Sequence, residues 1–89
     1  MATVEFARAF QRHVDCPSED LVGATLGEVL DAYFERHPSV RSYVVDDQGS
    51  FRKHVTLFVD NEQVDHQRGA ATTVGPASCV HVFQALSGG

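Results

Sequence analysis

Apolar and polar residues alternate in three short segments of the chain, and this alternation is typical of half-buried β-strands. Near the start, residues 3–7 place Val4 and Phe6 in one phase. Residues 54–59 and 79–84 alternate in the same way, and one phase of each is aliphatic, with Val55, Leu57, Val59, Val80 and Val82. The opposite phase carries Phe58, His81 and Phe83, so these side chains are expected on the other face of the sheet.

A further strand is predicted over residues 11–16, returning as a hairpin from the first strand. Pro17 has no backbone N–H for a ladder, and it is therefore expected to mark the end of that strand.

A single helix is predicted from residue 25 to about residue 37. Thr25 and Glu28 have the spacing of a capping box, in which each side chain satisfies an amide at the helix start. Residues at helical spacing then form one apolar stripe, made of Leu26, Val29, Leu30, Tyr33 and Phe34. Pro38 disfavours helical geometry at His37, which places the end of the helix there.

The remaining segments are short. Residues 40–45 are interpreted as a helical turn or a brief strand, residues 63–71 as polar and irregular, and residues 46–49, 60–61 and 75–76 as turns. The order hairpin, helix, strand, turns and strand predicts an α+β fold: a ubiquitin-like β-grasp, with a mixed four- to five-stranded sheet and one main helix across one face. We expect this domain to span residues 1–84, followed by a flexible C-terminal tail, residues 85–89.

Composition narrows the function. Eighty-nine residues with 43% hydrophobic content fit one small folded domain. Twelve acidic against seven basic residues give a net charge of −5, which disfavours nucleic acid and anionic membranes and suits a positively charged partner protein. No apolar run is long enough for a membrane helix, and no secretory signal is recognisable, so we expect a cytoplasmic protein with reduced thiols.

The residue types needed for metal binding or nucleophilic catalysis lack the necessary spacing. Five histidines are present, but none forms a His-x-x-x-His pair or has a Cys-x-x-Cys partner, so no metal site is predicted. Cys16 and Cys79 are interpreted as structural or surface thiols, because a catalytic cysteine needs a base and a pocket.

The candidate reactive group lies at the C-terminus. Gly88 and Gly89 have no side chains, so this end can pass through a narrow channel and present a bare carboxylate to another enzyme. Residues 85–89, a five-residue extension, connect the last predicted strand to this carboxylate.

Three segments carry a resemblance to the MoaD/ThiS family of sulfur-carrier proteins, with the CysO-like and MoaD-like members most similar. They are residues 25–30 (Thr-Leu-Gly-Glu-Val-Leu), residues 54–62 and residues 82–89, ending in Gly-Gly. The chain departs from the family pattern at residues 75–80, where many members have a Gly-Asp-Glu/Ser-Val turn, and at residues 59–61, where Val-Asn-Gly is common. Neither departure touches the C-terminal residues, so the resemblance still implies a carrier, but it does not identify which biosynthetic pathway receives the sulfur.

The resemblance implies a carrier and not an enzyme. A ubiquitin-activating-type enzyme would use ATP and Mg²⁺ to adenylate the Gly89 carboxylate, and a desulfurase or rhodanese would supply sulfur for a Gly89 thiocarboxylate. A sulfur-accepting synthase would then receive the sulfur. Two phenylalanines on an open sheet face suggest a binding surface, so Phe58, His81, Phe83 and Leu86 are expected to contact the partner, unless a loop covers the rings or the sheet curls. The resemblance implies that an aromatic at the position of Phe83 contacts the activating enzyme, and that no cofactor is bound by this chain. Two alternatives remain open: a ubiquitin-like modifier conjugated through Gly89, and an interaction domain without such chemistry.

Overall fold

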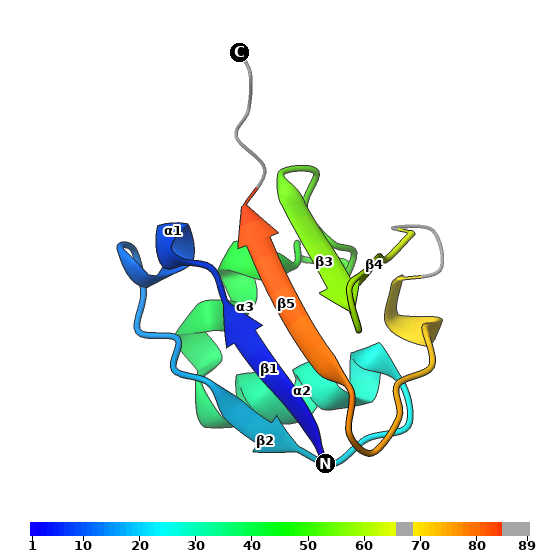
Figure 1. The fold of residues 1–89 in the computed structure, drawn as a ribbon. Helices are drawn as coiled ribbons and strands as arrows, with labels where there is room; N and C mark the ends of the chain where they lie inside the picture. The colour runs from blue at the N-terminus through cyan, green and yellow to red at the C-terminus, as the bar shows by residue number, and fades with distance from the viewer. Residues whose placement is uncertain (66–68, 85–89) are drawn as a thin grey trace.

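A mixed five-stranded sheet forms the body of the computed structural model, which describes residues 1–65 and 69–84 (Figure 1). The strands lie in the order β2-β1-β5-β3-β4 and comprise β1 (Ala2–Phe6), β2 (Glu19–Leu21), β3 (Val55–Val59), β4 (Glu62–Gln63) and β5 (Cys79–Gln84). The central strand β5 pairs with β1 in parallel, and the other neighbouring strands are antiparallel. The expected mixed sheet is therefore confirmed.

Helices cover one face of this sheet. The main helix α2 (Leu26–Arg36) and the following α3 (Pro38–Val44) lie behind the strands in Figure 1, while α1 (Arg8–Gln11) lies beside the end of β1. A 3-10 turn, η1 (Gly69–Ala71), packs near the start of α2. No described helix crosses the front face.

The ends of α2 follow the sequence prediction. The Thr25 hydroxyl accepts a hydrogen bond from the Glu28 amide at 3.3 Å, and the Glu28 carboxylate accepts one from the Ala24 amide at 3.0 Å. The carboxylate thus binds one residue before the cap, and not the amide of the cap itself. The helix ends at Arg36, and Pro38 opens α3 in the first turn, where its missing N–H leaves no bond unmade.

The core lies between α2 and the sheet. All five residues of the α2 stripe are buried, as are the aliphatic residues of β3 and β5, Val55, Leu57, Val59, Val80 and Val82. The predicted strand phase and helix face are both confirmed. Apolar area removed from water stabilises the fold by roughly 25 cal/mol per Å², so this contact is its main support.

The predicted strand over residues 11–16 is wrong. Gln11 belongs to α1, and β2 begins at Glu19, after Pro17 and not before it. Apolar residues in this part of the chain fill the end of the core instead. Phe10, in α1, is buried edge to face against Phe6, with ring centroids 5.5 Å apart, and Cys16 is also buried. Packing at the end of the core therefore overrides the strand-like alternation.

Two further segments are more regular than expected. Residues 40–45 fall largely within α3, which settles the choice between helix and strand. Residues 63–71, interpreted as irregular, contribute Gln63 to β4 and end in η1. The turn at Asp60 and Asn61 returns the chain so that Gln63 pairs with Phe58, a register that short polar sequences do not reveal.

Candidate functional site

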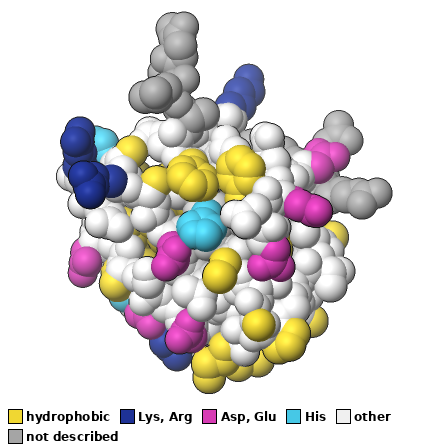
Figure 2. Space-filling view, in the orientation of Figure 1, with side chains coloured by type: hydrophobic (Ala, Val, Ile, Leu, Met, Phe, Trp, Pro, Cys, Tyr) yellow, Lys and Arg dark blue, Asp and Glu magenta, His cyan; other side chains and the backbone are white. Residues whose placement is uncertain are grey.

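Two phenylalanines lie together on the front face of the sheet. In the antiparallel pairing of β3 with β5, Phe58 lies opposite His81 and Thr56 opposite Phe83. The rings of Phe58 and Phe83 meet edge to face with centroids 5.5 Å apart, and the His81 ring stacks 6.1 Å from Phe83. Phe83 is 41% exposed. Figure 2 shows hydrophobic side chains beside a histidine near the centre of this face. We call Phe58, His81 and Phe83 the aromatic patch.

The aromatic patch borders an open depression. Its volume is about 520 Å³, and it is lined by Phe58, Asn61, His81 and Phe83. Such a shallow, mainly apolar surface suits a protein side chain better than an enclosed small molecule.

Glu5 holds His81 in place. The carboxylate Oε2 of Glu5 lies 2.8 Å from Nε2 of His81, where a ring N–H donates to it. The contact depends on the parallel pairing of β1 with β5, which sets Glu5 opposite His81. Glu5 and Asn61 are the site residues that the sequence analysis missed. In the sequence, Glu5 alternates with Val4 and Phe6, which already indicated that it lies on the open face of the sheet.

The tight turn beside the aromatic patch is fixed by Asp60. Asp60 and Asn61 have φ of 51° and 71°, in the left-handed region that Asn and Asp tolerate. Asp60 Oδ1 accepts from the Cys79 amide at 3.0 Å, and Oδ2 accepts from the Ser78 hydroxyl at 2.8 Å. These bonds, chiefly that from Cys79, lower the pKa of Asp60 below its ordinary value of 3.8.

The terminal site residues lie outside the described residues. These are Leu86, Gly88 and Gly89, together with the rest of the predicted tail, residues 85–89. The described chain ends with β5 at Gln84, one residue beyond Phe83. The aromatic patch therefore lies beside the point from which the chain continues to Gly89.

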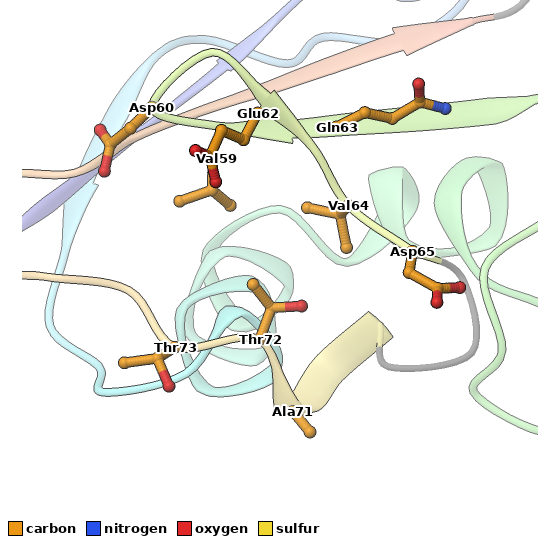
Figure 3. A pocket seen from close by; sticks show the side chains of 9 residues that line it. All are labelled: Val59, Asp60, Glu62, Gln63, Val64, Asp65, Ala71, Thr72 and Thr73. Atoms are coloured by element: carbon orange, nitrogen blue, oxygen red, sulfur yellow. The ribbon is translucent and has the colours of Figure 1, made fainter.

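A second cleft, of about 650 Å³, lies between the β3–β4 turn and residues 71–73 (Figure 3). Its lining includes Asp60, Glu62 and Asp65, but the Asp60 carboxylate is already engaged by Ser78 and Cys79. Within residues 1–65 and 69–84, no three His, Cys, Asp or Glu side chains are grouped to hold a metal ion. The cleft thus offers a polar surface without a recognisable ligand set.

The two thiols differ in exposure. Cys16 is buried and Cys79 is exposed, and both are free. Burial raises the pKa of the Cys16 thiol, with a smaller effect from Asp15, which makes it less reactive. No helix in the described part of the chain has both the length and the apolar character needed to cross a bilayer.

Several solved structures share the fold. One chain of the BexX/CysO complex from Amycolatopsis orientalis is 22% identical, with a TM-score of 0.84 and all of both chains covered. CysO from Mycobacterium tuberculosis, described as an antigen, is 22% identical, with a TM-score of 0.82 over 97% of this chain and 100% of that one. SAMP1 from Haloferax volcanii is 22% identical, with a TM-score of 0.78 over 99% and 98%. At these identities the likeness establishes the ubiquitin-like β-grasp fold alone.

Sequence comparison establishes the family. No curated protein sequence matches the chain significantly. The sequence profile of the ThiS family, however, matches residues 7–89, which include most of the sheet, all the helices and the terminal Gly-Gly. The chain therefore belongs to the ThiS family.

Proposed function

We propose that this chain is a sulfur carrier that acts through the carboxylate of Gly89. The observation that carries the proposal is the ThiS-family match, which runs through Gly88 and Gly89 and not only through the folded part. The chain would serve as a co-substrate, and the catalytic residues would belong to its partners.

The proposed chemistry activates a poor acyl donor. The Gly89 carboxylate attacks the α-phosphate of ATP on a ubiquitin-activating-type enzyme, and Mg-bound pyrophosphate leaves. The product is an acyl-adenylate, whose AMP is a good leaving group. A sulfide equivalent from a desulfurase or rhodanese then attacks the acyl carbon, and the bond to AMP breaks, leaving a thiocarboxylate. This group is nucleophilic and can deliver sulfur to an accepting synthase.

The aromatic patch would dock the chain on these partners. Phe58 and Phe83 are large apolar side chains on an uncovered face, next to the point where β5 ends. Exposed aromatics of this kind often anchor protein interfaces. The CysO chain crystallised with BexX supports a protein partner for this fold. Leu86, beyond the described residues, is proposed to extend the same surface.

The test is direct detection of the thiocarboxylate. The purified chain ending at Gly89 is incubated with ATP, Mg²⁺, a sulfide source and a ubiquitin-activating-type adenylating enzyme from the same organism, and its intact mass is measured. We expect a gain equal to the difference between a sulfur and an oxygen atom, together with ATP–pyrophosphate exchange. A chain lacking Gly88 and Gly89 is the control and should stay folded but support neither reaction. Exchange by the truncated chain would show that Gly89 is not the reacting group.

Protein modification is the second candidate. It is favoured by the similarity to SAMP1, which is described as a small archaeal modifier protein. Both functions begin with the same adenylation, so exchange alone does not separate them. Conjugates of higher mass that survive reducing gels, and that disappear when Gly88 and Gly89 are deleted, would identify a modifier.

A further inference from the structure

Basic side chains flank the end of β5, although the chain as a whole is acidic. On the β1 side, the Ala7 amide donates to the Val82 carbonyl at 2.8 Å, so the next residue, Arg8, lies level with the end of β5. On the β3 side, Val55 pairs with Gln84, so Lys53 lies just beyond that end. Figure 2 shows Lys and Arg side chains on both sides of this end of the molecule, with carboxylates below the central hydrophobic group and along the right side of the face.

Within residues 1–65 and 69–84, three of these cations form no ion pair. Arg8 begins α1, which packs against β5, and Arg12 is the C-cap of the same helix. Both are exposed, as is Lys53, and no ion pair joins any of the three to a described residue. By contrast, Arg36 is paired with Glu19 at 3.0 Å. Arg52 is also engaged within the chain, because its Nε donates a hydrogen bond to the Ser42 carbonyl at 2.7 Å. We call Arg8, Arg12 and Lys53 the basic rim.

The aromatic patch and the basic rim together resemble the layout of a protein interface. Phe58 and Phe83 supply an apolar centre, and the cations lie around it where the chain continues towards Gly89. Interfaces commonly have an apolar centre and a charged rim, and complementary rim charges mainly accelerate encounter and fix orientation. The net charge of −5 favours a basic partner, but it does not describe this end of the molecule.

We infer that the surface of the activating enzyme around the entrance for this C-terminus carries carboxylates that pair with Arg8, Arg12 and Lys53. The inference rests on the proposed function, since it assigns the chemistry of the partner at the same site. It predicts that recognition weakens with added salt, because screening shortens the reach of exposed charges.

Charge reversal tests the inference. Arg8→Glu and Lys53→Glu are compared with Arg41→Glu, which makes the same change in net charge on α3, where Arg41 borders Asp31 and Glu35 of α2. All three side chains are exposed, and a glutamate in the first turn of α1 suits the helix dipole, so folding should be retained, as thermal melts will check. ATP–pyrophosphate exchange with the adenylating enzyme is measured while NaCl is raised from about 50 to about 500 mM.

We expect Arg8→Glu and Lys53→Glu each to lower kcat/KM by about tenfold at low salt, mainly through KM. The difference from wild type should shrink at high salt, and Arg41→Glu should stay within about twofold of wild type. Wild-type rates from both rim variants, or an equal loss in Arg41→Glu, would overturn the inference while leaving the carrier function intact. Absence of exchange by the wild-type chain would instead overturn the proposed function and this inference with it.

Discussion

Phe58 and Phe83 meet edge to face on adjacent antiparallel strands, with ring centroids 5.5 Å apart, on the face of the sheet that no described helix covers. In each strand the phenylalanine alternates with buried aliphatic residues, so packing of the core holds the backbone beneath both rings in place. The rings therefore form a pre-arranged apolar surface, which lowers the ordering entropy lost when a partner binds.

We predict that Phe83→Ala weakens binding to the activating enzyme by about 1–3 kcal/mol, the range for an aromatic anchor. Stability against unfolding should change by less than about 1 kcal/mol, because Phe83 lies on the open face. Calorimetric titration with the enzyme and a thermal melt measure the two quantities separately.

The matched control is Tyr43→Ala on α3. Tyr43 is 39% exposed, close to the 41% of Phe83, but it lies on α3, and its hydroxyl reaches the His13 carbonyl, at 3.5 Å, and not the aromatic patch. Binding should be unchanged in this variant. A Phe83→Ala chain that binds normally but melts many degrees lower would mean that Phe83 stabilises the fold and not the complex.

The parts of the fold that follow local rules could be predicted from the sequence. In β5, the period of two in residues 79–84 placed Val80 and Val82 in the core and Phe83 outside. For α2, the Thr25 cap and Pro38 fixed both ends. These signals succeed because they depend on neighbouring residues, whose geometry the backbone alone dictates.

The parts that failed depend on contacts between distant residues. Glu5 and His81 are 76 positions apart, and only the parallel register of β1 and β5 brings them together. Residues 11–16 are predicted as a strand from the sequence, but Gln11 ends a short helix from which Phe10 packs on Phe6 at the end of the core. The basic rim likewise joins segments separated by about forty residues in sequence. The net charge of the whole chain is negative, so it does not reveal a local group of cations.

Thr25→Ala should destabilise the chain by about 0.5–1 kcal/mol, the lower part of the range for a lost helix cap. The lower part is expected because the Thr25 hydroxyl lies 3.3 Å from the Glu28 amide, a long hydrogen bond. Urea unfolding followed by circular dichroism is suitable, since the chain has no Trp. The control, Thr73→Ala, removes an exposed hydroxyl opposite Thr25 and should change stability by less than about 0.5 kcal/mol. Equal losses in both variants would argue against the cap.

In Gly27→Ala, two effects on the free energy of unfolding oppose each other: the higher helix propensity of alanine and the closer packing of its methyl group. Alanine is favoured over glycine inside a helix by about 0.8–1 kcal/mol. A methyl group on Gly27, however, would lie 2.7 Å from Cβ and 3.1 Å from the carbonyl oxygen of Ala70 in η1. Relieving such overlap typically costs about 1–3 kcal/mol, so we expect net destabilisation in a urea titration.

The double variant Gly27→Ala with Ala70→Gly removes the Cβ contact and should recover part of the loss. This coupling between the two positions is the signature of a direct clash. A Gly27→Ala chain more stable than wild type would show that η1 moves aside freely.

The last prediction concerns acid stability and Asp60. Its carboxylate accepts hydrogen bonds from the Cys79 amide and the Ser78 hydroxyl, and these lower its pKa below the ordinary value of 3.8 in the folded state. In the unfolded chain the pKa returns to about that value, so the unfolded state binds the proton more readily. The stabilisation is therefore present above the unfolded pKa and is lost as the pH falls through the folded pKa.

Asp60→Asn tests this sign. Asparagine tolerates the positive φ of 51° and keeps an oxygen acceptor, but it cannot titrate. The free energy of unfolding should be lower than wild type at neutral pH and should fall less steeply between about pH 5 and about pH 2. Asp47→Asn, in the exposed turn after α3 where the Asp47 side chain forms no hydrogen bond to a described residue, should run parallel to wild type. If the Asp60→Asn curve also ran parallel, the acid sensitivity of the fold would have to come from another carboxylate, of which Glu19, paired with Arg36 and His37, is the next to test.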